Sequence, residues 1–369
     1  MHSFIYRVIF KSDEFVGVPL RGEITMDRSK ALRCFIAGIF AIILIASQSA
    51  TAQDRKLVLR VADQFPVNHF IPRYGLKPWM EQVTKATSGE VQFEYYPAEQ
   101  LGKAKDLLSL VQSGVADIVL FAPSYASDKM PLTAALELPG MFDSSCQGTT
   151  MQWKLAKEGG FLAQREYAPN GVRVLFSPIL PPYKMVSAKR KIESLGDIKG
   201  MKLRILGGAM ELAMHRLKVV GIKISSSDLF EAISRGTLDG AIFSHSGTVT
   251  YNLPAKYVTV RESFGSAATV FIISENRWKQ LPDHVKKAMT EAGEAANHSV
   301  CAGMDKEEAD ALEKLKQNGV TAVRWSAADK REMDAVLASV ADEWAAELDK
   351  RGKPGSEVLK AVLEARSGR

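Results

Sequence analysis

A long stretch without proline near the C-terminal end constrains the fold more than any other feature. Pro282 introduces it and Asn318 and Gly319 follow it, so residues 283–317 are predicted to form one helix. At 1.5 Å per residue that helix would span roughly 50 Å, which is longer than one small domain. A break into two helices near Gly303 is the alternative. We therefore expect a helix that runs across two domains.

Short apolar runs alternate with helical stretches in two series along the chain. Because this order is typical of βαβ units, the sequence predicts an α/β fold with a ligand cleft between two domains. Two further amphipathic helices are expected near 327–350 and 357–365. Strands are expected at 56–62, 91–96, 117–121, 172–176, 201–205, 222–224 and 240–243, and helices near 74–88, 103–113, 209–218 and from Asp228, where Glu231 completes a capping-box pattern.

The N-terminal region has the pattern of an export signal. Basic residues at 28–33 precede the apolar run 34–46, whose thirteen residues are too few for the roughly 20 of a membrane-spanning helix. Residues 1–25 carry acidic side chains before this segment, so translation is expected to start at Met26. We predict a signal peptide at 26–52, cleavage after Ala52 and a mature chain in the periplasm. A signal anchor that stays in the membrane is the alternative.

Charge and cysteine content narrow the possible partners. Removing the first 52 of 369 residues takes away six of 48 basic and four of 42 acidic residues, which leaves 317 residues with a net charge of +4. Basic and acidic residues interleave, so nucleic acid is not expected as a partner. Of the three cysteines, Cys34 leaves with the signal peptide. Cys146 and Cys301 either pair in the oxidising periplasm or stay two separate buried thiols, and the sequence leaves both open.

The sequence signatures of common enzymes are missing. There is no G-x-S-x-G, H-E-x-x-H, P-loop, G-x-G-x-x-G or C-x-x-C motif. Ser244, His245 and Ser246 are neighbours, but adjacent residues on a strand point to opposite faces and rarely form a nucleophile and base pair. The histidines lack metal-ligand spacing. We therefore predict a binding protein without catalytic residues, metal or cofactor. A periplasmic enzyme acting on carboxylates is the alternative.

Several short motifs occur in the order found in one family of binding proteins. Through them the chain resembles the solute-binding proteins of TRAP (tripartite ATP-independent periplasmic) transporters, the group related to C4-dicarboxylate-binding proteins. The ordered set covers nearly all of the mature chain. The motifs are Leu59–Ala62 with Pro66 and His69, Tyr96-Pro97 with Gln100–Gly102, Val111–Gly114 with Ala116-Asp117, Glu137–Gly140, Ile192–Gly200, Lys202–Arg204, Ala232–Gly236 with Asp239-Gly240, and Trp278 with Leu281-Pro282.

The resemblance implies two α/β domains that are joined by strands and a long helix and that close around a carboxylate ligand. We place domain I at 53–181 plus 270–303 and domain II at 182–269 plus 304–369. It also implies that the protein delivers a small organic acid to the integral membrane subunits of a TRAP transporter, and we expect it to be mostly a monomer. A ligand-loaded partner of a membrane sensor is the other binding function that fits.

The cation of the predicted site is an arginine. In the family, the arginine of the motif matched by residues 202–204 forms a salt bridge with the ligand carboxylate, and the resemblance gives this role to Arg204. A guanidinium suits the role because its planar fork binds a carboxylate bidentately and stays charged when buried. A structural ion pair at a strand end is the alternative. Some members have a second arginine where Lys184 stands, and a lysine is a point charge that either contacts the ligand or is solvated.

The rest of the predicted site is apolar and aromatic. Its side chains follow strands or occupy loops that face the cleft in the resemblance, and packing in the protein core is the alternative for each of them. If most of them line the pocket, a monocarboxylate with an apolar or aromatic body fits better than a compact dicarboxylate. The assigned residues are Phe65, Tyr125, Tyr183 and Phe243, with Ser244 beside them and His69 as a hydrogen-bonding partner for a hydroxyl or as a turn cap.

Overall fold

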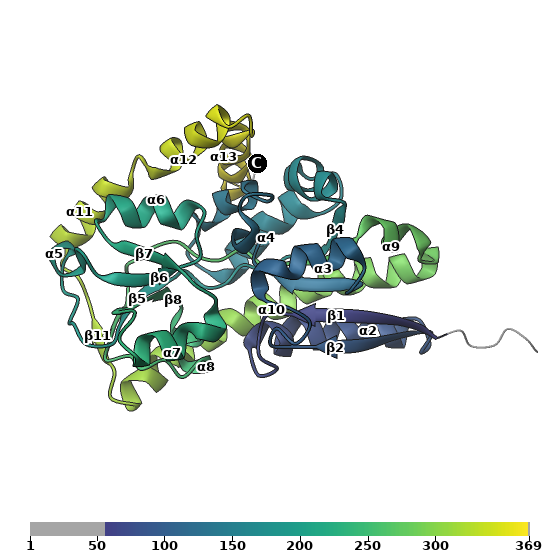
Figure 1. Ribbon diagram of the computed structural model, residues 1–369, viewed down its shortest axis with the longest axis horizontal. Coiled ribbons are helices and arrows are strands. Elements are labelled where there is room, and N and C mark those ends of the chain that lie inside the picture. The colour runs from purple at the N-terminus through teal and green to yellow at the C-terminus, as the bar shows by residue number, and fades with distance from the viewer. Residues whose placement is uncertain (1–55, 368–369) are drawn as a thin grey trace, which may run out of the picture. The chain divides into compact units, whose positions relative to one another are not determined.

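Two β-sheets carry the two predicted α/β series (Figure 1). The computed structural model describes residues 56–367, so the predicted start at Met26 and the signal peptide at 26–52 lie outside the described residues. The α/β fold class is confirmed, since each sheet combines parallel strand pairs with helical connections. No helix in this part of the chain is long and apolar enough to cross a membrane, and no group of His, Cys, Asp or Glu side chains within it could hold a metal ion.

The first sheet has five strands in the order β2-β1-β3-β10-β4. Strand β1 runs parallel to β2 and β3, while β10 returns from far along the chain and pairs antiparallel with β3 and β4. All residues of the central strand β3 are buried, as expected where helices cover both faces of a sheet. The strands are β1 Leu57–Asp63, β2 Val91–Tyr96, β3 Ile118–Phe121, β4 Val172–Phe176 and β10 Val270–Ser274.

The second sheet has six strands in the order β11-β9-β5-β8-β6-β7. A Cβ at Gly240 would lie 1.9 Å from the Val186 carbonyl oxygen, so glycine is required where β8 approaches β5. Strand β6 lies between β8 and β7 and parallel to both. The strands are β5 Lys184–Ser187, β6 Lys202–Ile205, β7 Val220–Lys223, β8 Gly240–Phe243, β9 Tyr257–Thr259 and β11 Thr321–Val323.

The helices match most of the predicted ranges, with two differences. The predicted helix at 327–350 is two helices, Ala327–Leu337 and Val340–Lys350, and the Ser339 hydroxyl between them donates to the Glu343 carboxylate. The predicted capping box at Asp228 is wrong, since its side chain caps no backbone N–H. The helices are α2 Lys77–Ala86, α3 Leu107–Ser113, α4 Ser145–Ala156, α5 Leu195–Ile198, α6 Ala209–Arg216, α7 Leu229–Ser234, α8 His245–Thr250, α9 Glu275–Gln280, α11 Ala327–Leu337, α12 Val340–Lys350 and α13 Gly355–Arg366, with short helical turns including η4 Pro123–Ala126, η5 Leu132–Glu137 and η8 Ser226–Asp228.

Helix α10, Asp283–Gln317, forms without a break, as the sequence predicts. It packs against α2, α4 and β4 beside the first sheet and against α8 and β11 beside the second (Figure 1). A Cβ at Gly293 would lie 2.0 Å from the Leu175 carbonyl oxygen, and one at Gly303 would lie 2.5 Å from the Tyr74 ring. The glycines therefore let neighbouring elements contact the helix backbone. Helix α10 thus packs beside both sheets as one continuous helix.

A disulfide ties α4 to α10. Cys146 and Cys301 are bonded across 155 residues of chain, which answers the question that the sequence leaves open. One helical turn further along α10, the Asp305 carboxylate accepts hydrogen bonds from the Ser145 and Cys146 backbone N–H groups at 2.6 and 3.2 Å. A carboxylate at the first turn of a helix satisfies N–H groups that have no partner within the helix. The start of α4 is thus fixed to α10 twice.

The domain boundaries stay a prediction. Strands β1 to β4 and β10 form the first sheet, and β5 to β9 and β11 form the second. Helix α13 belongs to the range 304–369 that was assigned to domain II, yet it packs against α4 and η5, which the same division assigned to domain I. Helices α11 and α12, by contrast, pack against α6.

Candidate functional site

A cavity lies where strands of both sheets end. The segments that follow β1 and β3 of the first sheet and β6 and β8 of the second sheet supply most of its lining, and α/β proteins usually bind ligands at the carboxyl ends of their strands. The space open to the centre of a water-sized sphere is about 10 Å³, roughly what one water molecule needs. The lining residues are Gln64, Phe65, His69, Ala122, Tyr125, Leu180, Tyr183, Arg204, Leu206, Ser226, Phe243, Gly247, Tyr251, Ala267 and Thr269. The two sheets are therefore closed on each other, and an organic acid requires this cavity to widen.

Arg204 is the cation of this cavity. It lies on β6, is 0% exposed, and is held by the Ile224 carbonyl, which accepts from Nε at 3.2 Å. Nη2 donates to the Tyr125 hydroxyl at 2.8 Å and to Ser226 Oγ at 3.1 Å. Nη1 is buried and has no hydrogen bond of good distance and angle among the described residues, although the Tyr183 hydroxyl lies close enough to the guanidinium to raise its pKa. Three of the five N–H donors of the guanidinium are thus used by the protein, and the two on Nη1 remain.

The guanidinium is not in contact with a carboxylate of the described residues, although its charge opposes the rise in the pKa of the buried Glu137 carboxyl. Burial by itself lowers the pKa of Arg204, but the nearby hydroxyls of Tyr125 and Tyr183 raise that pKa above its usual value. Its Cζ atom lies 5.1 Å from the centre of the Phe243 ring, within the range of a cation–π contact. None of the ion pairs among residues 56–367 includes Arg204. A buried cation with free donors is suited to bind an anion that enters the cavity.

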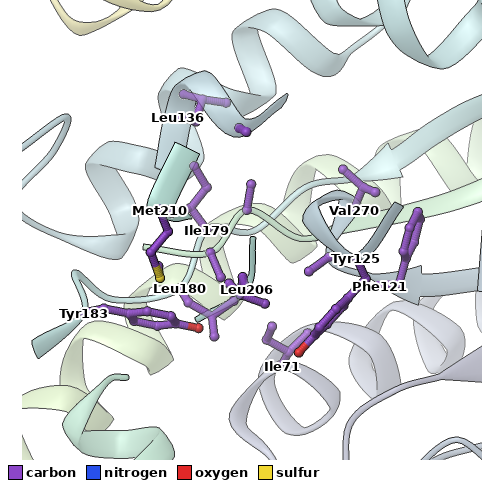
Figure 2. Packing of buried hydrophobic residues seen from close by; sticks show 14 of the residues in the cluster. Ile71, Phe121, Tyr125, Leu136, Ile179, Leu180, Tyr183, Leu206, Met210 and Val270 are labelled. Atoms are coloured by element: carbon purple, nitrogen blue, oxygen red, sulfur yellow. The ribbon is translucent and has the colours of Figure 1, made fainter. Parts of the chain in front are cut away.

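Aromatic side chains form the wall around Arg204. The rings of Phe65 and His69 are stacked with centres 4.2 Å apart, and those of Tyr183 and Phe243 lie 5.6 Å apart. Figure 2 shows Tyr125 and Tyr183 on either side of Leu180, which also lines the cavity. The structure thus brings six of the eight predicted site residues together: Arg204, Phe65, His69, Tyr125, Tyr183 and Phe243.

His69 contributes a neutral ring. Burial, helped by the nearby charge of Arg73, lowers its pKa to about 3. Nδ1 accepts a hydrogen bond from the Ile71 backbone N–H at 3.3 Å, so the proton of the neutral ring sits on Nε2. His69 therefore caps this turn and also lines the cavity, while its hydrogen bond to a ligand hydroxyl stays a prediction. A neutral imidazole can donate to a hydroxyl or carbonyl but supplies no charge for a carboxylate.

Buried carboxyls surround the cavity without lining it. Burial raises the pKa of Asp63 to about 8 and those of Glu137 and Glu166 to about 7. Asp63 accepts from the Phe65 backbone N–H and from the Tyr95 hydroxyl, both at 2.8 Å, and so fixes the turn that carries Phe65. Since none of the three lines the cavity, they do not form an acid and base pair within it.

The lining also contains residues that the sequence did not indicate. Tyr251 follows α8, and its buried hydroxyl has no hydrogen-bonding partner among the described residues. Gln64 accepts from the Ala122 N–H at 3.0 Å through its side chain and connects the ends of β1 and β3. No local pattern marks these residues, because their neighbours in the cavity come from distant parts of the chain.

The family follows from a comparison with known sequences. A family model described as bacterial extracellular solute-binding protein, family 7, matches residues 68–348. The chain belongs to this family. Among the relatives of this solute-binding protein, the C4-dicarboxylate-binding periplasmic protein DctP of Rhodobacter capsulatus is 29% identical over 311 residues, 79% of this chain and 86% of that one.

Solved structures of TRAP solute-binding proteins share the fold. One from a marine metagenome, described as specific for aromatic acid ligands, is 23% identical, with a TM-score of 0.77 over 85% of this chain and 99% of that one. One from Rhodoferax ferrireducens, in complex with copurified benzoate, is 19% identical, with a TM-score of 0.77 over 85% of this chain and 98% of that one. The resemblance that the sequence motifs carry is therefore confirmed.

Two predicted site residues of this solute-binding protein do not line the cavity. Lys184 is half-buried on β5; burial lowers its pKa, which the carboxylates of Glu308 and Glu262 oppose. Ser244 is fully buried and its hydroxyl accepts from the Gly247 N–H at 2.9 Å, as the N-cap of α8. Each directly follows a residue that does line the cavity, and neighbours in an extended chain point to opposite sides.

Proposed function

We propose that this protein captures a small organic acid in the periplasm and delivers it to the integral membrane subunits of a TRAP-type secondary transporter. The main support for this proposal is the state of Arg204. Its guanidinium is fully buried at the end of β6 and lines a closed cavity, and its Nη1 has no hydrogen-bonding partner among the described residues. Burying a charge is costly unless it is paired, and a carboxylate supplies the missing pair.

Arg204 is positioned before the ligand arrives. Ile224 and Ser226 hold it from the second sheet, and Tyr125 holds it from the first. Nε and Nη2 already donate hydrogen bonds to the protein, so a carboxylate binds Nη1 first. To bind the carboxylate with both Nη1 and Nη2, Arg204 must break the hydrogen bond from Nη2 to Tyr125 or to Ser226. A ligand at this point touches groups from both sheets and so favours the closed arrangement over the open one.

The relatives support an organic acid as the ligand class. The Rhodobacter capsulatus relative is named for C4-dicarboxylates, and the two solved structures are described with aromatic acids. For this chain the proposal includes export, with cleavage after Ala52 and a mature protein that begins at Gln53. It also includes release of the acid chemically unchanged, since the cavity lining holds no nucleophile beside a base.

A ligand screen tests the proposal. Protein secreted to the periplasm is first sequenced from its N-terminus, where Gln53 is expected. It is then heated with members of an organic-acid library, because a ligand that binds the native state raises the unfolding temperature. Each hit is incubated with the protein and analysed by mass spectrometry. We expect hits only among acids, recovered unchanged; a product in molar excess over the protein would contradict a binding function.

A further inference from the structure

Two buried polar groups of the cavity have no hydrogen-bonding partner among residues 56–367. One is Nη1 of Arg204 and the other is the hydroxyl of Tyr251. Buried polar atoms are nearly always hydrogen-bonded in folded proteins, so each exception calls for a reason. Both belong to residues that line the same cavity, and one shared reason is a ligand that carries two polar groups.

The two residues that carry these groups both contact the Phe243 ring. The Arg204 Cζ atom lies 5.1 Å from the centre of the Phe243 ring, and the Tyr251 ring centre lies 5.8 Å from it in an edge-on arrangement. Tyr251 also lies 5.9 Å from the ring of His69, which stacks on Phe65. A flat ligand body between these rings would reach Arg204 with one polar group and Tyr251 with another.

The charges at the two ends differ. Arg204 is the only lysine or arginine among the residues that line the cavity. At the other end, burial raises the pKa of Tyr251 well above its usual value, and burial keeps His69 neutral. A second carboxylate would meet no cation there, whereas a hydroxyl or a carbonyl would find a neutral hydrogen-bonding partner.

We propose that Tyr251 determines specificity by binding a hydroxyl or carbonyl group on the body of an aromatic monocarboxylate whose carboxylate is held by Arg204. This assignment rests on the proposed function and names the ligand class of that same cavity. A site that hydrogen-bonds a ligand hydroxyl discriminates strongly against the analogue that lacks it, because the protein group is then left unpaired. A dicarboxylate is rejected for the opposite reason, since its second charge is buried without a partner.

The test compares Tyr251→Phe with the wild-type protein by calorimetric titration. The probes are benzoate and phenylacetate, their monohydroxylated isomers, and succinate. We expect the best hydroxylated isomer to bind the wild-type protein at least about tenfold more tightly than its parent acid, and succinate to bind weakest. In Tyr251→Phe the hydroxylated isomer should fall to the affinity of its parent, while the parent keeps its affinity within about threefold.

Two controls separate this role from a structural one. Tyr96→Phe removes a hydroxyl on β2 that bonds only Glu94 outside the cavity, and it should leave every affinity unchanged. Since the Tyr251 hydroxyl has no partner in the part of the chain that the structure describes, Tyr251→Phe should unfold at the same or a higher temperature without ligand.

The outcomes also separate this assignment from the function on which it rests. A preference for the hydroxylated isomer that survives in Tyr251→Phe, or succinate binding more tightly than the monocarboxylates, would overturn the role of Tyr251 and leave acid capture standing. Failure of the wild-type protein to bind any acid of the wider library would overturn both.

Discussion

Removing the bond between Cys146 and Cys301 should weaken the fold measurably without preventing it. The two residues are 155 apart in sequence, and the chain-entropy relation for a loop of that length gives roughly 5 kcal/mol. Measured losses for native disulfides are typically about 2–5 kcal/mol. Asp305 still binds the first N–H groups of α4 after the bond is removed, so the native arrangement has a second restraint. We therefore expect Cys146→Ala/Cys301→Ala to fold, with a free energy of unfolding about 2–5 kcal/mol lower.

Guanidinium unfolding, followed by far-UV circular dichroism with and without dithiothreitol, measures this loss. The reductant should lower the stability of the wild-type protein to that of the double variant and leave the variant unchanged. Because Cys34 lies in the predicted signal peptide, the mature protein should contain no free thiol when it is unfolded without reductant. Two free thiols in that assay, or a double variant as stable as the wild type, would refute the reasoning.

Three further predictions concern pH, closure and packing. Folding raises the pKa of Asp63 from 3.8 to about 8, so the stability that its protonated form contributes is complete below pH 3.8 and is lost progressively as pH rises to about 8. Calorimetry should therefore show the unfolding temperature falling across this range and levelling off above it. An equal fall in Asp63→Asn would contradict this. Ser227 donates a hydrogen bond to Glu99 at 3.0 Å and so joins segments of the two sheets in the closed arrangement. Ser227→Ala should therefore weaken ligand binding roughly two- to tenfold in titrations. If the effects of Glu99→Gln and Ser227→Ala simply add in the double variant, the two residues do not act through this bond. Gly293→Ala would place a Cβ 2.0 Å from the Leu175 carbonyl oxygen. It should lower the free energy of unfolding by about 1–3 kcal/mol in urea. A variant with the same free energy of unfolding as the wild type would show that α10 and β4 are not in close contact at this point.

The sequence predicted those features whose causes are local. Pro282 cannot continue a preceding helix, and Asn318 and Gly319 end one, so both ends of α10 could be placed. The use of Gly293 could not be predicted, because the Leu175 carbonyl that requires it lies far away in sequence. A glycine inside a helix indicates either a bend or a close neighbour, and only the packing decides between them.

In the site, too, local motifs predicted some residues, while the rest depend on contacts between distant parts of the chain. Arg204 could be assigned from its motif, but its free Nη1 depends on Tyr125 and Ser226, which come from other elements. Tyr251 has no local signal at all. The alternation of side chains argues against Lys184 and Ser244, since each adjoins a lining residue on an extended chain and therefore points the other way. A serine directly before a helix is also a common N-cap, which is the role that Ser244 has.

The affinity of Arg204→Ala for an acid identified by the screen is the strongest test of whether Arg204 holds the ligand carboxylate. Losing one partner of a buried charge pair costs on the order of 3–5 kcal/mol, so the dissociation constant should rise roughly a hundredfold or more in calorimetric titration. Arg204→Lys should recover only part of the loss, because an ammonium keeps the charge but not the bonds to Ile224 and Tyr125 together. Lys202→Ala, which removes an exposed cation from the same strand, should bind like the wild type. We expect this order of affinities, and a folded Arg204→Ala that binds the acid with wild-type affinity would contradict the role assigned to Arg204.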